Sequence, residues 1–145
     1  MSRTYVPIKL RRQVRADAQA RCGYRHSPEE FLGMPLDIEH MLPEALGGLT
    51  VRENLWLACT RCNDFKGDHI SAVDPLTGEI VSLFNPRIHR WTDHFAWSLD
   101  RTHIEGLTPT GRATVEALRL NNSFIVLTRQ FWVEAARWPP PDDIP

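Results

Sequence analysis

Residues 37–67 read DIEHMLPEALGGLTVRENLWLACTRCNDFKG, and this stretch decides what the chain can fold into and do. It places a carboxylate beside an imidazole at Glu39 and His40, and it ends in a Cys-x-x-Cys pair followed by an asparagine and a lysine. A proline and a Gly-Gly pair in the middle are typical of a loop. A stretch selected only for packing would not need this set of side chains, so we expect a functional site here.

Alternation across 36–41 predicts a strand in which Glu39 and His40 point to opposite faces unless the strand bends at its end. The apolar run 55–58, which Asn54 opens, predicts a second strand. Between them lie the turn-forming residues, so the two strands are expected to be neighbours along the chain.

A basic helix is expected upstream of this stretch. Leu10, Val14 and Ala18 repeat at a spacing of four, which predicts a helix with Pro7 in its first turn and a stop at Gly23. Seven basic residues and one acidic residue precede Glu29, although the net charge of the whole chain is −1. Such a segment can attract phosphate, or it can simply be a solvated helix face. The basic residues off the apolar stripe are Arg11, Arg12 and Arg15.

The second half of the chain predicts strands and helices but carries no motif. A strand is expected at 80–84, a hairpin at 94–107 and a helix from Thr108-Pro109. Another helix is expected to be capped by Ser123, and three prolines end it before a disordered tail at 139–145. Its predicted apolar stripe consists of Phe124, Leu127, Phe131, Ala135 and Trp138.

The whole chain sets limits on the class of protein. Its 145 residues suit one domain, 1–145, and no run of eighteen apolar residues predicts a membrane span. The start lacks the apolar core of a signal peptide, so we expect a cytoplasmic protein. Three cysteines cannot form a closed set of disulfides, and a Cys-x-x-Cys pair then points to metal or redox chemistry.

The stretch resembles the HNH endonuclease family in seven elements that occur in order. These are an acidic residue with a histidine, a proline, a Gly-Gly pair, Asn-Leu, a Cys-x-x-Cys pair, an asparagine and a lysine. Here they are Glu39-His40, Pro43, Gly47-Gly48, Asn54-Leu55, Cys59 with Cys62, Asn63 and Lys66. The resemblance extends from about Leu10 to Gly67. It implies an α+β fold with a ββα-metal core at about 8–70 that includes the basic helix. An extension at about 71–138, with a β-hairpin and two helices, would pack on this core.

The resemblance also implies the chemistry of a phosphodiester hydrolase that acts on DNA with Mg²⁺ or Mn²⁺. His40 would be the general base, because its reference pKa lies near neutral pH. Glu39 and Asn63 would hold the divalent metal through oxygen atoms. Asn54 would orient the loop that carries the histidine. Phosphate contacts would come from Lys66 and from the three arginines, Arg11, Arg12 and Arg15.

The family also implies a structural zinc held by two Cys-x-x-Cys pairs, and here the first pair is incomplete. Cys22, Cys59 and Cys62 are present, but Arg25 stands where a fourth cysteine is expected. Arginine cannot ligate a metal, because its guanidinium stays protonated. His26 is the nearest replacement and would complete a Cys₃His set. The alternative is that zinc is lost, that the three thiols simply pack and that Arg25 is exposed.

Two further functions compete with the metal-dependent endonuclease. One is a catalytically inactive DNA-binding module of the same fold with a degenerate zinc site. The other is a Cys-x-x-Cys redox protein, which the missing βαβ pattern disfavours. Neither a membrane nor a small-molecule cofactor is expected as a partner. The target sequence, the choice between nicking and double-strand cleavage, the oligomeric state and the biological role do not follow from the sequence.

Overall fold

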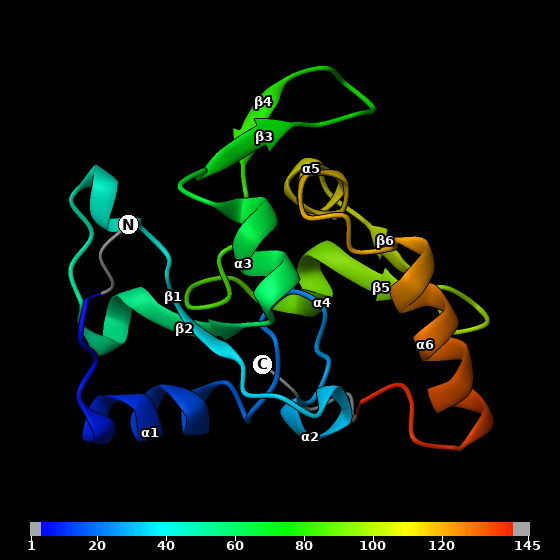
Figure 1. Ribbon diagram of the computed structural model, residues 1–145. Helices are drawn as coiled ribbons and strands as arrows, with labels where there is room; N and C mark the ends of the chain where they lie inside the picture. The colour runs from blue at the N-terminus through cyan, green and yellow to red at the C-terminus, as the bar shows by residue number, and fades with distance from the viewer. Residues whose placement is uncertain (1–3, 141–145) are drawn as a thin grey trace. The chain divides into compact units, whose positions relative to one another are not determined.

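The computed structural model describes residues 4–140 and divides the chain into two compact units, which join between His69 and Ile70 (Figure 1). Both units combine helices with small antiparallel sheets, so the α+β class is confirmed. The division lies next to the predicted border between the core and the extension, and that the two form a single domain stays a prediction. The predicted tail lies, from residue 141 onward, outside the described residues.

The first unit begins with the expected helix, α1 (Ile8–Asp17). Its stripe is directed inward, since Val14 and Ala18 are buried. The predicted stop at Gly23 is wrong, because the helix already ends at Asp17. The cause is the backbone at Gln19, which has a φ of 55° and so leaves the right-handed helical region.

A two-stranded antiparallel sheet forms the centre of the first unit. β1 (Asp37–His40) pairs with β2 (Leu55–Ala58), and Glu39 lies opposite Trp56. All four residues of β2 are buried, and α1 contacts this strand. The two strands occur where the alternation and the apolar run predict them. Three short helical segments lie between these elements: α2 (Glu29–Leu32), η1 (Glu44–Leu46) and η2 (Arg52–Asn54).

Helix α3 (Thr60–Lys66) follows β2 directly and contacts both strands of the sheet. Cys59 is its N-cap residue, and the helix begins at Thr60. This start places Cys62 and Asn63 on the first turns of the helix. The order of two strands and a helix therefore brings the chemically active side chains of the stretch onto adjacent elements.

The described part of the second unit, residues 70–140, contains two hairpins and three helices. Helix α5 (Pro109–Ala117) contacts one strand of the second hairpin and both strands of the first. No helix in the described part of the chain has the length and apolarity that a membrane crossing requires. The elements are β3 (Ser71–Val73), β4 (Ile80–Ser82), α4 (Trp91–His94), β5 (Phe95–Trp97), β6 (Ile104–Gly106), α5 (Pro109–Ala117) and α6 (Ser123–Glu134).

The apolar stripe predicted for α6 is wrong at four of its five residues, and Trp138, which lies beyond the end of the helix, is buried. Phe124 is 82% exposed and Phe131 is 59% exposed, whereas Ile125 and Arg129 are buried. Apolar residues occur on nearly every side of this helix, so spacing alone does not decide which side packs inward. The buried guanidinium of Arg129 donates to the carbonyls of Thr102 and Leu120 at 2.9 and 2.8 Å, which satisfies a group that sequence patterns place on a surface.

Candidate active site and thiol cluster

His40 is the last residue of β1, and its ring contacts the loop that follows. Its Nε2 atom lies 2.9 Å from the hydroxyl oxygen of Thr50 and 3.8 Å from a carboxylate oxygen of Glu44. The side chain is 16% exposed, so the ring is oriented by neighbours yet still reaches solvent. The Glu44 carboxylate favours a hydrogen on Nε2, and the Thr50 hydroxyl can accept from it. A neutral imidazole with that hydrogen carries its lone pair on Nδ1.

Asn54 holds the two ends of this loop together. Its Oδ1 accepts from the N–H of Leu42 at 2.8 Å, and its Nδ2 donates to the carbonyls of Leu42 and Leu49 at 3.0 and 2.9 Å. Gly48 makes the close approach possible, because a Cβ atom there would lie 1.7 Å from the Leu42 carbonyl oxygen. These three hydrogen bonds restrain the chain immediately after His40, which supports the positioning role that is proposed for Asn54.

Glu39 points away from His40 and forms an ion pair with Lys66 of α3. The Glu39 Oε1 and Lys66 Nζ atoms are 3.2 Å apart, and each side chain is only 4% exposed. Burial raises the pKa of Glu39, although the Lys66 ammonium acts in the opposite direction. Lys66 also donates to the carbonyl of His40 at 3.4 Å, so it links α3 to the end of β1. In this structure its ammonium is therefore engaged inside the protein.

Asn63 lies beside a carboxylate that the sequence analysis did not include in the site. Its Nδ2 donates to Oδ2 of Asp37 at 3.3 Å, and both residues are half-buried. Asp37 shares one face of β1 with Glu39, because residues two apart in a strand point the same way. That alternation is the signal by which Asp37 could have been found.

The oxygen atoms of Glu39 and Asn63 are of the type that a hard divalent cation prefers. Both carboxylate oxygens of Glu39 are buried, and the Lys66 ammonium lies 3.2 Å from one of them. A buried carboxylate needs a compensating charge, which Lys66 provides here. The residues thus fit a metal in donor chemistry, and a divalent ion bound at Glu39 would take over the charge that Lys66 now supplies.

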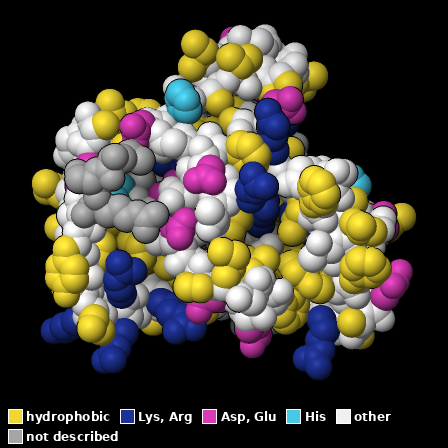
Figure 2. Space-filling model, in the orientation of Figure 1, with side chains coloured by type: hydrophobic (Ala, Val, Ile, Leu, Met, Phe, Trp, Pro, Cys, Tyr) yellow, Lys and Arg dark blue, Asp and Glu magenta, His cyan; other side chains and the backbone are white. Residues whose placement is uncertain are grey.

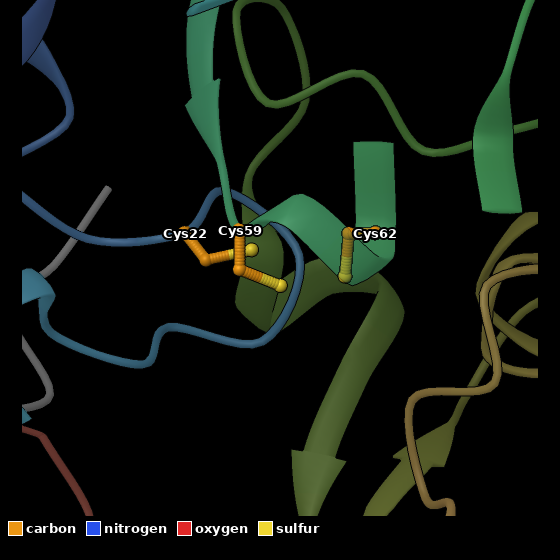
Figure 3. A group of neighbouring side chains, drawn as sticks. All are labelled: Cys22, Cys59 and Cys62. Carbon is orange, nitrogen blue, oxygen red and sulfur yellow. The ribbon is translucent and has the colours of Figure 1, made fainter. Parts of the chain in front are cut away.

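Three buried thiols form a cluster where segment 22–27 meets the start of α3 (Figure 3). The Sγ atoms of Cys22, Cys59 and Cys62 all lie within 4.8 Å of one another, which is close enough to hold a metal ion. Hydrogen bonds from the other two cysteines hold the pKa of Cys59 well below its ordinary value. Burial raises the pKa of Cys22 and of Cys62.

The structure does not bring His26 into this cluster. Among the described residues, this group of candidate metal ligands consists of the three sulfurs alone. No ring nitrogen of His26 therefore lies within 4.8 Å of all three. The His26 backbone has a φ of 61°, and its N–H donates to the carbonyl of Cys22 at 2.9 Å. Burial and the nearby charge of Arg21 lower the pKa of His26 to about 3, so the ring is neutral at neutral pH.

The basic side chains of α1 lie on the surface of the first unit. Figure 2 shows dark blue side chains gathered over the region where Figure 1 draws α1. Arg11, Arg12 and Arg15 are all exposed. Arg15 forms an ion pair with Glu29 at 2.7 Å, and Arg11 donates to the carbonyl of Val6 at 3.2 Å.

Comparison with known proteins supports the interpretation of residues 37–67. A family model described as HNH endonuclease matches residues 29–73, a range that includes β1, β2 and α3 but leaves out α1 and Cys22. No curated protein and no solved structure shows a significant match to the chain. The resemblance predicted from the sequence is confirmed for this segment: residues 29–73 match the HNH endonuclease family.

Proposed function

We propose that residues 29–73 form the active site of a metal-dependent endonuclease that hydrolyses phosphodiester bonds of DNA, with a ββα-metal core made of β1, β2 and α3. The observation that carries the proposal is the restraint of His40 within a segment that matches the HNH family. Asn54 ties the following loop with three hydrogen bonds, and Thr50 contacts Nε2 of the imidazole. A general base needs this kind of fixed orientation.

In the proposed mechanism, Nδ1 of His40 accepts a proton from a water molecule as the water oxygen attacks phosphorus. The bond from phosphorus to the leaving sugar oxygen breaks as the new bond forms. The nearby Glu44 carboxylate, 3.8 Å from Nε2, favours the imidazolium that results. A divalent metal bound at Glu39 and Asn63 would polarise the phosphate and stabilise the leaving oxygen.

Lys66 has two successive partners in this scheme. In the structure it neutralises Glu39, and a bound metal ion would release it from that role. The freed ammonium lies on the helix that also carries Asn63, so it is suited to hold a phosphate oxygen by charge. The exposed arginines of α1 would supply further contacts with the DNA backbone.

Incubation of supercoiled plasmid with the full chain tests the proposed function. We expect nicking with Mg²⁺ or Mn²⁺ and none with EDTA, while gel-shift binding persists in all three conditions. Binding without cleavage in any metal would contradict the enzyme and support an inactive DNA-binding module. The buried positions of the thiols disfavour the redox alternative, because exchange requires access to the sulfur.

The arginines of α1 are expected to set the salt dependence of DNA binding. Removal of one phosphate-binding cation should reduce the slope of log K against log salt by about 0.9. The triple variant Arg11→Ala/Arg12→Ala/Arg15→Ala should therefore bind more weakly and with a flatter slope. A matched control removes three exposed arginines of the second unit, Arg90, Arg101 and Arg137. Equal slopes in the two variants would make the α1 arginines an ordinary solvated face.

A further inference from the structure

The thiol cluster lacks the fourth ligand that a structural zinc site requires. Structural zinc is almost always four-coordinate, and its protein ligands close the site completely. Among the described residues, the three cysteine sulfurs form the group, and no histidine, aspartate or glutamate side chain adds a fourth ligand atom to it. The residue three positions after Cys22, where the family has a fourth cysteine, is Arg25.

Arg25 is buried in the same segment as Cys22. Its side chain belongs to a residue that is only 5% exposed, and its charge acts on all three thiols. The N–H of His26 donates to the carbonyl of Cys22 at 2.9 Å, which closes a turn that keeps residue 25 close to Cys22. The residue that stands where the family has a fourth cysteine is therefore a buried cation beside the cluster.

We propose that the guanidinium of Arg25 closes the three-thiol cluster in place of a metal ion, so that the first unit holds this junction together without zinc. A guanidinium stays protonated, and its N–H groups can point at the surrounding sulfurs. Its permanent positive charge, buried beside the sulfurs, repels a dication from the same space. Arg25 thus supplies the positive charge that zinc supplies in a four-cysteine site.

The backbone around Arg25 supports a junction that does not depend on metal. The N–H of Gly23 donates to the carbonyl of Leu57 at 2.9 Å, which ties segment 22–27 directly to β2. Within the segment, the N–H of Cys22 donates to the carbonyl of Ser27 at 3.1 Å, and the N–H of His26 donates to the carbonyl of Cys22 at 2.9 Å. These bonds fix the segment independently of any ligand at the sulfurs.

Metal content and thermal unfolding of the full chain test this proposal, and neither depends on nuclease activity. Protein expressed with zinc in the medium should contain far less than one zinc ion per chain by elemental analysis. Its melting temperature should be the same with EDTA and with added zinc. Stoichiometric zinc whose removal lowers the melting temperature would overturn the proposal.

Two substitutions at position 25 make the test sharper. Arg25→Cys should create a four-sulfur site that binds one zinc per chain and melts at a lower temperature in EDTA; a variant that takes up no zinc would show that Arg25 does not occupy the fourth position. Arg25→Gln removes the charge and should lower the melting temperature by about 10 °C, while the exposed control Arg12→Gln should not. Equal melting temperatures for both glutamine variants would also overturn the proposal.

Discussion

Replacing His40 by alanine is expected to lower plasmid nicking by about two to four orders of magnitude, the usual contribution of a general base. The affinity for DNA should change little, because the imidazole is assigned to proton transfer and the phosphate contacts to other residues. Single-turnover cleavage with excess enzyme measures the chemical step directly. Gel-shift titration of the same protein in EDTA measures binding without cleavage.

A matched control distinguishes this role from a general effect of removing a histidine. His69 belongs to the same unit and is exposed, so His69→Ala should cleave at close to the wild-type rate. Thermal unfolding of both variants shows whether the fold is kept. Cleavage by His40→Ala at the wild-type rate would remove His40 from the proposed mechanism.

Lys66→Met is expected to destabilise the first unit by about 3–5 kcal/mol, because it leaves the Glu39 carboxylate buried without its partner. The double variant Glu39→Gln/Lys66→Met should recover much of this loss, since no uncompensated charge remains inside. Arg61→Met removes an exposed cation from the same helix and should have little effect. Urea denaturation of the four proteins, wild type included, measures these differences.

Divalent metal provides a second measurement on the same variants. If Glu39 is a metal ligand, Mn²⁺ should stabilise Lys66→Met, because the ion replaces the missing ammonium. Binding to the folded state alone at one hundred times Kd contributes about 2.7 kcal/mol. The double variant lacks the carboxylate and should gain far less. Equal stabilisation of both variants by Mn²⁺ would show that the ion does not bind at Glu39.

The parts of the fold that the sequence predicts correctly depend on local signals. The strands at 37–40 and 55–58 follow from alternation and from an apolar run, and α1 follows from a spacing of four. The clustering of three cysteines follows from the family resemblance, and the sulfurs do lie together. In each case neighbouring residues carry enough information, because the period of the element appears in the sequence itself.

The parts of the fold that the sequence does not predict depend on which residues, far apart in the sequence, pack against each other. Lys66 is predicted to contact phosphate, but in the structure it is buried against Glu39. His26 is the nearest histidine to the incomplete Cys pair, yet its ring nitrogens do not lie within 4.8 Å of all three sulfurs. Helix α6 has apolar side chains on several sides, so only its packing decides that Ile125 rather than Phe124 is buried.

The loop after β1 has a consequence for how this sequence can vary. Asn54 binds Leu42 and Leu49 only through their backbone atoms, and both leucine side chains are exposed. Positions 42 and 49 can therefore accept many residues without loss of the clamp. Position 48 can accept only glycine, and position 54 needs an oxygen acceptor and an N–H donor on one short side chain. Substitutions should thus accumulate beside the clamp, while the two residues that build it stay the same.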